Sequence, residues 1–201
     1  QSYNGSEKFS NEYRFEFFPS AAVGWMLSNE NFMKNISWLE MFKIRASYGL
    51  VGNDNISGRW LYQTLWEYGG NSILGSTLQM TSPYTWYTEG TIGNPDIHWE
   101  TVTKKNLGFE FGFLRGLIKG TVDLFNDYRT DILIAGGNRA LLDYLGGDPP
   151  TANLGEVEVK GYEVEVKLNR TFSNGLGLWV NVGMTHAVDK IIFADDPALL
   201  P

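Results

Sequence analysis

Strict alternation of large apolar side chains with small or polar ones is the feature that most constrains the fold of this 201-residue chain. The clearest run spans residues 106–113, where the two kinds of side chain take turns without interruption: Leu107, Phe109, Phe111 and Phe113 against Asn106, Gly108, Glu110 and Gly112. Side chains two positions apart share one face of an extended strand. The run therefore predicts a strand with one apolar and one polar face.

The alternation resumes over residues 118–128, after a short turn at Arg115 and Gly116. Two alternating runs joined by a tight turn predict an antiparallel hairpin. We expect one of its faces to be apolar and to carry six side chains: Leu107, Phe109, Phe111, Ile118, Val122 and Leu124.

Two further hairpins follow from the same pattern. One covers residues 162–185 and turns at 173–175, where Asn-Gly supplies the positive φ that a short turn requires. The other pairs the alternating runs at 20–27 and 43–48. The sequence thus predicts an all-β fold with six strands in three antiparallel hairpins.

The connections between these strands differ sharply in length. The turns at 114–116 and 173–175 are very short, whereas the segments at 52–97 and 136–152 are long and rich in Gly, Pro, Asn, Tyr and Trp. Transmembrane β-barrels have short periplasmic turns and long external loops, and compact soluble domains rarely carry loops of this length. The asymmetry favours antiparallel up-and-down strands of a transmembrane β-barrel. A soluble β-sandwich would show the same alternation and stays open as the alternative.

Aromatic residues near the expected strand ends also favour a barrel, because barrels carry aromatic girdles at both membrane interfaces. We expect these side chains to belong to such girdles: Phe17, Phe18, Trp99, Phe125, Tyr128, Phe172 and Phe193.

Composition excludes several classes of function. With 16 Lys and Arg against 23 Asp and Glu and no basic block, nucleic acid is not expected as a partner. There is no cysteine and no apolar run of about 18 residues, so thiolate chemistry and a membrane-spanning helix are excluded. Because the chain begins at Gln1 without an export signal and ends at Pro201 after an apolar run, we expect it to be part of a longer protein.

The chain offers little for catalysis. Glu163 and Glu165 share a face and could be imagined as an acid–base pair, but a polar wall explains them better. His98 and His186 are the only histidines and have no helical partner for a metal site. We expect neither an enzyme, a cofactor nor a metal site.

Several segments resemble motifs of one family, the SusC/RagA TonB-dependent outer-membrane transporters, and occur in the family's order. They are Phe17–Ser20 with Gly24 and Trp25, Lys43–Gly49 with Gly52 and Asn53, Asn94–Glu100, Tyr128–Leu133, and Asn153–Val157 with Gly161–Glu163. Lys160 departs from the pattern, since the family usually has Asn there. The matches cover nearly the whole chain.

The resemblance implies that residues 1–201 are part of a 22-stranded barrel, about six strands of its C-terminal half, with the plug domain and signal peptide outside the chain. It implies a protein of the cell outer membrane that imports glycan or peptide fragments with a SusD-like lipoprotein, driven by the TonB complex through an absent N-terminal region. The polar side chains would then face the lumen and the plug: Arg45, Glu110, Lys119, Asp123, Glu163, Glu165 and Lys167.

The aromatic residues of the long segment 52–97 are the candidates for ligand or partner contact. Flat aromatic rings with polar tips suit sugar rings and peptide side chains. We assign this contact to four residues of an external loop: Trp66, Tyr84, Trp86 and Tyr87. The alternative function is a secreted carbohydrate-binding β-sandwich that uses the same aromatic loop as its platform.

Overall fold

The computed structural model describes residues 1–56, 58–72, 84–140 and 149–195. The strands are β1 (Ser2–Gly5), β2 (Phe15–Phe18), β3 (Ser20–Met26), β4 (Leu39–Asn53), β5 (Leu65–Ser72), β6 (Tyr84–Thr91), β7 (Glu100–Phe113), β8 (Ile118–Ile134), β9 (Ala152–Thr171) and β10 (Gly177–Phe193). Two short 3-10 helices, η1 (Leu27–Asn29) and η2 (Gly136–Asn138), complete the described elements. Among the described residues, no helix is long and apolar enough to cross a membrane.

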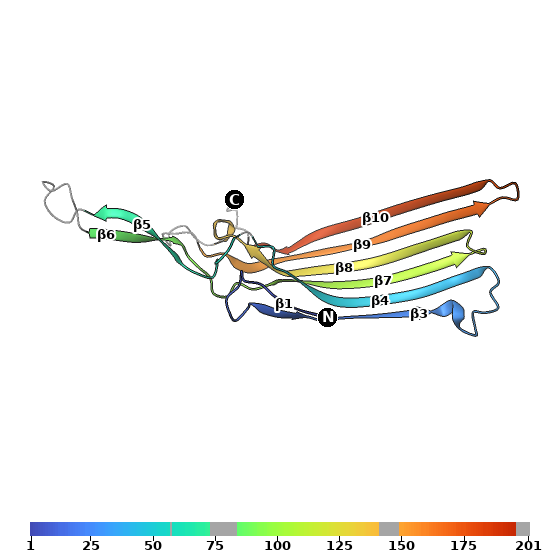
Figure 1. Ribbon diagram of the computed structural model, residues 1–201, viewed down its shortest axis with the longest axis horizontal. Coiled ribbons are helices and arrows are strands. Elements are labelled where there is room, and N and C mark those ends of the chain that lie inside the picture. Colours follow the sequence, from blue (N-terminus) through green and yellow to red (C-terminus); the bar gives the residue numbers. More distant parts are fainter. Residues whose placement is uncertain (57, 73–83, 141–148, 196–201) are drawn as a thin grey trace, which may run out of the picture.

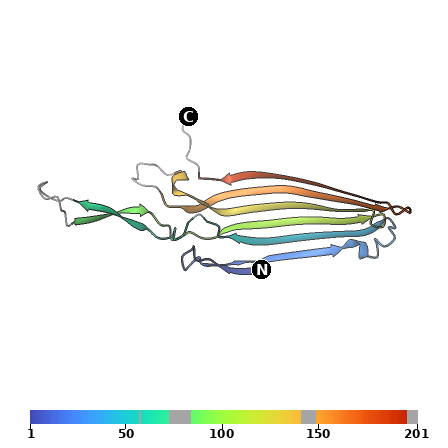
Figure 2. The ribbon, with the colours of Figure 1, turned by 45° about the horizontal axis from the view of Figure 1, so that its top comes forward.

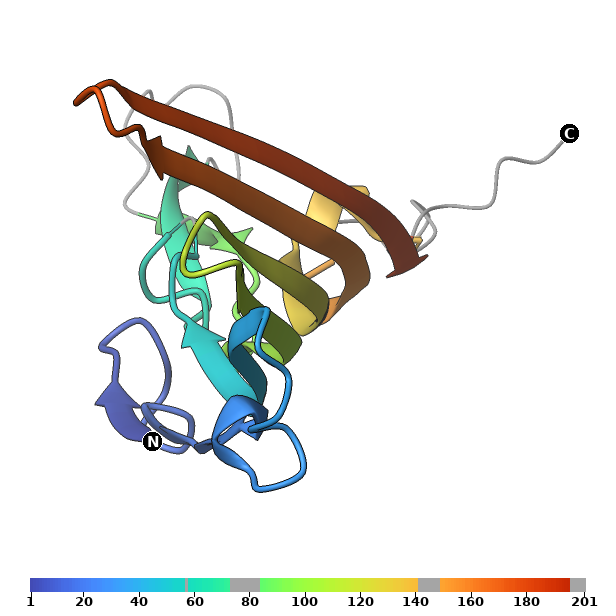
Figure 3. The same ribbon diagram turned by 90° about the vertical axis from the view of Figure 1, so that its right-hand side faces the viewer.

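Six strands form one antiparallel sheet in the order β10-β9-β8-β7-β4-β3 (Figure 1). They run side by side along the length of the molecule (Figure 2), and the sheet is curved when seen along its strands (Figure 3). Four of them are 15 to 20 residues long, far beyond the five or six residues of an ordinary strand. The sheet is open, because β3 and β10 form its two edges.

The three predicted hairpins are confirmed as β3–β4, β7–β8 and β9–β10. In β7–β8, Leu107 lies opposite Leu124 and Phe109 lies opposite Val122. The six predicted apolar side chains therefore share one face of the sheet. We call this side of the whole six-stranded sheet the apolar face, and the opposite side the polar face. None of the six is buried. No second sheet packs on this face within the described part of the chain.

The two short turns are also confirmed and lie at one end of the sheet (Figure 1). Between β7 and β8, Leu114, Arg115 and Gly116 all have positive φ. Between β9 and β10, Gly175 has a φ of 84°. These left-handed residues close the hairpins in a few residues.

The long segment 52–97 differs from its prediction as a loop, because it contains a strand pair. β5 and β6 form a separate two-stranded sheet that projects beyond the end of the large sheet opposite the tight turns (Figure 1). Two register shifts interrupt the pair and break the regular alternation that would identify strands from sequence. Residues 73–83 of this segment, 141–148 of the other long segment, and 196–201 lie outside the described residues.

A compact apolar core lies at the loop end of the sheet. It consists of Phe9, Phe18, Ile56, Ile97 and Trp99. The expectation that Phe18 and Trp99 belong to a membrane girdle is wrong, since both are buried there. Gly52 explains the position of the Phe18 ring, which occupies the space that a Cβ atom at Gly52 would need.

Phe125 also departs from the girdle prediction. It alternates with Leu124 and so lies on the polar face of β8, opposite Gly161 of β9. A Cβ atom on Gly161 would lie 2.5 Å from the Phe125 Cζ atom, so the ring fills the space above the glycine.

Candidate functional site

The polar face of the large sheet carries a charged cluster centred on Arg45 of β4. Its Nη2 donates to Asp123 of β8 at 2.7 Å, and its Nε lies 3.1 Å from Glu110 Oε1 of β7. Lys43 Nζ approaches the same Glu110 oxygen at 3.3 Å. Two cations and two carboxylates from three strands thus form one network, which fixes their side chains across the sheet.

Gly108 makes this network possible. Arg45 lies opposite Gly108, and Gly108 lies opposite Asp123, so the arginine must cross β7 to reach β8. A Cβ atom on Gly108 would lie 2.6 Å from Arg45 Nε. The missing side chain is therefore a requirement of the bridge, because any larger residue would occupy the path of the guanidinium group.

The other predicted lumen-facing residues share the polar face. Glu163 lies opposite Asp123, and Lys167 lies opposite Lys119. Lys167 Nζ pairs with Glu165 Oε1 at 3.0 Å. The register thus places two carboxylates side by side in the middle of the sheet and two lysines side by side nearer the turns. All seven residues assigned to this face lie on it.

The four aromatic residues assigned to ligand contact lie on the β5–β6 hairpin, but they do not form one surface. Trp66 and Tyr87 share a face with Tyr68, whose ring packs edge-on against Tyr87 with centroids 6.0 Å apart. Trp86 lies on the opposite face, over Gly69. By alternation Tyr84 shares the face of Trp86. The hairpin therefore presents two aromatic faces.

The aromatic side chains of the hairpin are exposed. Trp66 and Tyr87 are each 61% exposed, and Trp86 is 47% exposed. Tyr68, which is not among the four residues assigned from the sequence, completes the first face. Only the strand register, which the sequence did not reveal, identifies it as a neighbour of Tyr87.

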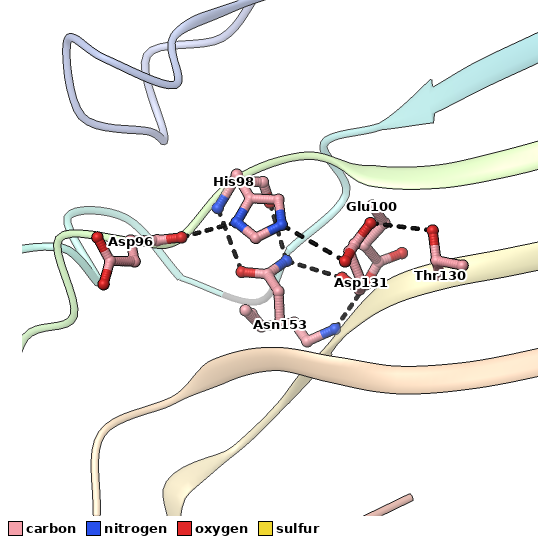
Figure 4. A network of polar contacts seen from close by, with 7 residues as sticks. Asp96, His98, Glu100, Thr130, Asp131 and Asn153 are labelled. Carbon is pink, nitrogen blue, oxygen red and sulfur yellow. Dashed lines mark hydrogen bonds and ion pairs between the residues drawn. The ribbon is translucent and has the colours of Figure 1, made fainter. Parts of the chain in front are cut away.

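A second polar cluster lies where the long loops leave the sheet (Figure 4). The Asn153 amide nitrogen donates to the carbonyl oxygens of His98 and Asp131, at 2.9 and 2.7 Å. In return, Asn153 Oδ1 accepts the backbone N–H of His98 at 3.2 Å. Asp131 has a φ of 59° and lies within a register shift of β8. Asn153 therefore ties a bulged strand end to the segment that enters β7.

Glu100 stabilises the same junction from a buried position. It is buried, with 7% of its surface exposed. Its two oxygens accept hydrogen bonds from the Asn53 side chain at 2.8 Å and from the Leu133 backbone N–H at 3.2 Å. A buried carboxylate with two donors is stabilised in place. Asn53, Glu100 and Asn153 all belong to the family-like motifs, so the motifs mark a structural clamp at the roots of the loops.

A scan against known families matches residues 1–198 to the family described as TonB dependent receptor-like, beta-barrel. TonB-dependent receptor P3 of Formosa agariphila is 30% identical over 176 residues, which cover 88% of this chain and 16% of that protein. TonB-dependent receptor SusC of Bacteroides thetaiotaomicron is 34% identical over 135 residues, 65% of this chain and 13% of that protein. The chain thus spans less than a fifth of the length of these relatives.

Solved structures of similar fold include the RagAB peptide importer in two states. The "closed-closed" state matches with a TM-score of 0.75 over 94% of this chain and 19% of that chain, at 22% identity. The "open-open" state matches with a TM-score of 0.78 over 92% of this chain and 19% of that chain, also at 22% identity. The likeness establishes a shared barrel fold.

Proposed function

The chain belongs to the TonB-dependent receptor-like β-barrel family, within its SusC/RagA type, and on that premise we propose that its full-length protein imports nutrient oligomers. Members of the family are outer-membrane proteins, and the six-stranded sheet is a segment of such a barrel. The alternative of a secreted β-sandwich is wrong, because the family match and the fold both identify a barrel. We infer transport, and not catalysis, as the activity of the protein.

The two-faced sheet is the observation that carries this proposal. Its apolar face is uncovered over the whole β7–β8 hairpin, while its polar face holds the Arg45, Glu110 and Asp123 network. In water an apolar surface of this size would need a partner, whereas lipid solvates it without cost. A polar inner face and an apolar outer face are what a large transmembrane barrel requires.

The polar face would line the lumen and contact a plug domain supplied by another part of the full-length protein. Lys119 and Glu163 support this proposal, because each lies opposite a like charge and has no ion-pair partner within 4.0 Å among the described residues, which favours a partner of opposite charge. Energy from the TonB complex would act through that other part of the full-length protein.

The β5–β6 hairpin would contact cargo or a SusD-like lipoprotein on the cell surface. Its position beyond the loop end supports this role, as do its exposed aromatic rings. SusC is one relative, and the RagAB neighbour is named a peptide importer. Glycan or peptide fragments are therefore the proposed cargo of this protein.

An uptake assay tests the proposal. A strain lacking the full-length gene, with and without a plasmid copy, would receive fluorescent oligosaccharides and oligopeptides. We expect the plasmid to restore accumulation of one cargo class and a protonophore to abolish that accumulation, since TonB-driven import depends on the proton gradient. Accumulation that is independent of the gene, or insensitive to the protonophore, would contradict TonB-dependent import.

A further inference from the structure

Ionisable side chains on the apolar face gather near its loop end. The register places Lys105 of β7, Asn126 of β8 and Lys160 of β9 side by side in one row. Glu158 and Lys190 lie opposite each other in the next row toward the loops. We infer that these three lysines bind phosphate-bearing lipid head groups of the outer leaflet. The inference rests on the proposed outward orientation of the apolar face.

Apart from the imidazole of His186, the rows of β8, β9 and β10 on the turn side of this cluster are uncharged as far as Arg170, which lies opposite Leu178 beside the turn. Leu124, Tyr162 and His186 form the adjacent row, and Val122, Val164 and Met184 form the one after it. Leu178, near the turn, and His186 are eight positions apart in β10. That is roughly 27 Å of extended strand, or about 20 Å of height at a strand tilt of ~40°. This height is close to the ~25 Å apolar band of outer-membrane barrels.

The lysine rows therefore begin where the hydrocarbon ends. They lie at the end opposite the tight turns, which is the external side in barrels of this kind. Tyrosines accompany them on the same face, since Tyr48 lies opposite Lys105 and Tyr128 lies opposite Glu158. Tyrosine is enriched at membrane interfaces. The row is thus at the height of the head groups of the outer leaflet.

The charges of the cluster leave cationic groups available. Lys160 Nζ pairs with Glu158 Oε1 at 2.8 Å, and the Asn126 amide donates to the same oxygen at 2.9 Å. A second carboxylate near the cluster, that of Glu156, accepts a hydrogen bond from the hydroxyl of Tyr128. Both carboxylates are thereby engaged.

Lys105 and Lys190 have no ion-pair partner within 4.0 Å among the described residues, and both are exposed. Lys105 and Lys160 are separated by two strand spacings, about 10 Å between their Cα atoms. Long, flexible lysine side chains can close on one phosphate across that distance. Basic groups at the membrane surface attract anionic head groups.

The chain supplies a matched control beside the proposed site. Lys104 precedes Lys105 in β7 but points to the polar face, where its Nζ pairs with Asp127 at 3.2 Å. Replacing either lysine with glutamine removes the same charge from the same strand. Only Lys105→Gln removes it from the lipid-facing side.

Native mass spectrometry of the delipidated full-length protein tests the inference. The probes are a bis-phosphorylated, acylated disaccharide lipid and its dephosphorylated counterpart. We expect the Lys105→Gln, Lys160→Gln, Lys190→Gln triple variant to bind the phosphorylated lipid about tenfold more weakly. Lys105→Gln alone should weaken binding measurably, whereas Lys104→Gln should bind as the unmodified protein does. The dephosphorylated lipid should bind the unmodified protein as weakly as the phosphorylated lipid binds the triple variant.

Heat-modifiable migration, measured in parallel, separates the possible failures. If the triple variant folds as a barrel and still binds the phosphorylated lipid as the unmodified protein does, this inference is wrong and the transport proposal stands. Equal binding of both lipids would also overturn it, in favour of contact with acyl chains alone. If the unmodified protein fails to migrate as a barrel in the outer-membrane fraction, both the inference and the proposed function are wrong.

Discussion

Phe109 and Glu110 are neighbours in β7, yet they lie on faces that are built in different ways. On the apolar face, Phe109 meets Val122 and other side chains that share only their apolarity. On the polar face, Glu110 belongs to a network in which Lys43 and Arg45 have defined positions and distances. Lipid accepts any apolar shape, so the first face depends on residue type. The second depends on particular partners and on the register that brings them together.

Phe109→Arg should cause the largest loss of stability, and it tests whether the apolar face contacts lipid. A charge near the bilayer midplane costs about 2 to 4 kcal/mol in a barrel. Urea titration of the full-length protein folding into lipid vesicles would measure this loss. Glu110→Arg is the control, and it should cost less than Phe109→Arg although it places a third cation beside Lys43 and Arg45, because a polar lumen solvates the new charge. Equal losses at the two positions would contradict the assignment of the two faces.

Gly108→Val should come next, with a loss of about 1 to 2 kcal/mol from overpacking. The new side chain would displace Arg45 from its path across β7 and separate it from Asp123. Gly112→Val is a matched control in the same strand, because the nearest atom to a Cβ atom there would be Met41 Cβ at 3.5 Å, an ordinary contact. The same urea titration applies. If both variants lose the same stability, strand propensity and not the arginine bridge explains the result.

Arg45→Met should have a smaller effect, about 1 kcal/mol, because Arg45 is partly exposed and water screens its ion pairs. The substitution keeps an unbranched, flexible side chain and leaves Glu110 and Asp123 without their shared cation. Adding Asp123→Asn to this variant should cost little more, since the pair is already broken. A double-mutant cycle with additive losses would show that Arg45 and Asp123 are not coupled.

Tyr68→Ala with Tyr87→Ala should have the smallest effect on folding, within about 0.5 kcal/mol, because these exposed side chains lie outside the large sheet. The pair should nevertheless reduce uptake or retention of the lipoprotein, since it removes one aromatic face of the hairpin. Trp86→Ala alters the opposite face and tests whether both faces act. Growth on the cargo would be compared with heat-modifiable migration. Normal uptake in both variants would show that neither aromatic face of the hairpin is needed to contact cargo or the lipoprotein.

Local pattern predicted the sheet because strand alternation is a property of neighbouring residues. Leu107 and Glu110 reveal their faces within a few positions of the chain, and Asn-Gly reveals its turn. Burial of Trp99 could not be predicted in this way, because its neighbour Phe9 in the core is 90 positions away.

The candidate site was predictable to a similar degree. The seven polar side chains follow from alternation alone, but the bridge from Arg45 to Asp123 needs the registers of two strand pairs. The opposite faces of Tyr87 and Trp86 follow from alternation as well. The pairing of Tyr87 with Tyr68 does not, because register shifts in β5–β6 set it.

The length of β9 bears on how the proposed cargo would reach the barrel. A strand needs about 9 to 11 residues to cross the membrane, and β9 has 20. The surplus of roughly nine residues, at ~3.3 Å each, raises a stiff collar about 20 Å above the lipid when the strand is tilted. The β5–β6 hairpin projects beyond the same end of the large sheet (Figure 1). Diffusing oligomers would therefore meet the aromatic rings before they meet the membrane.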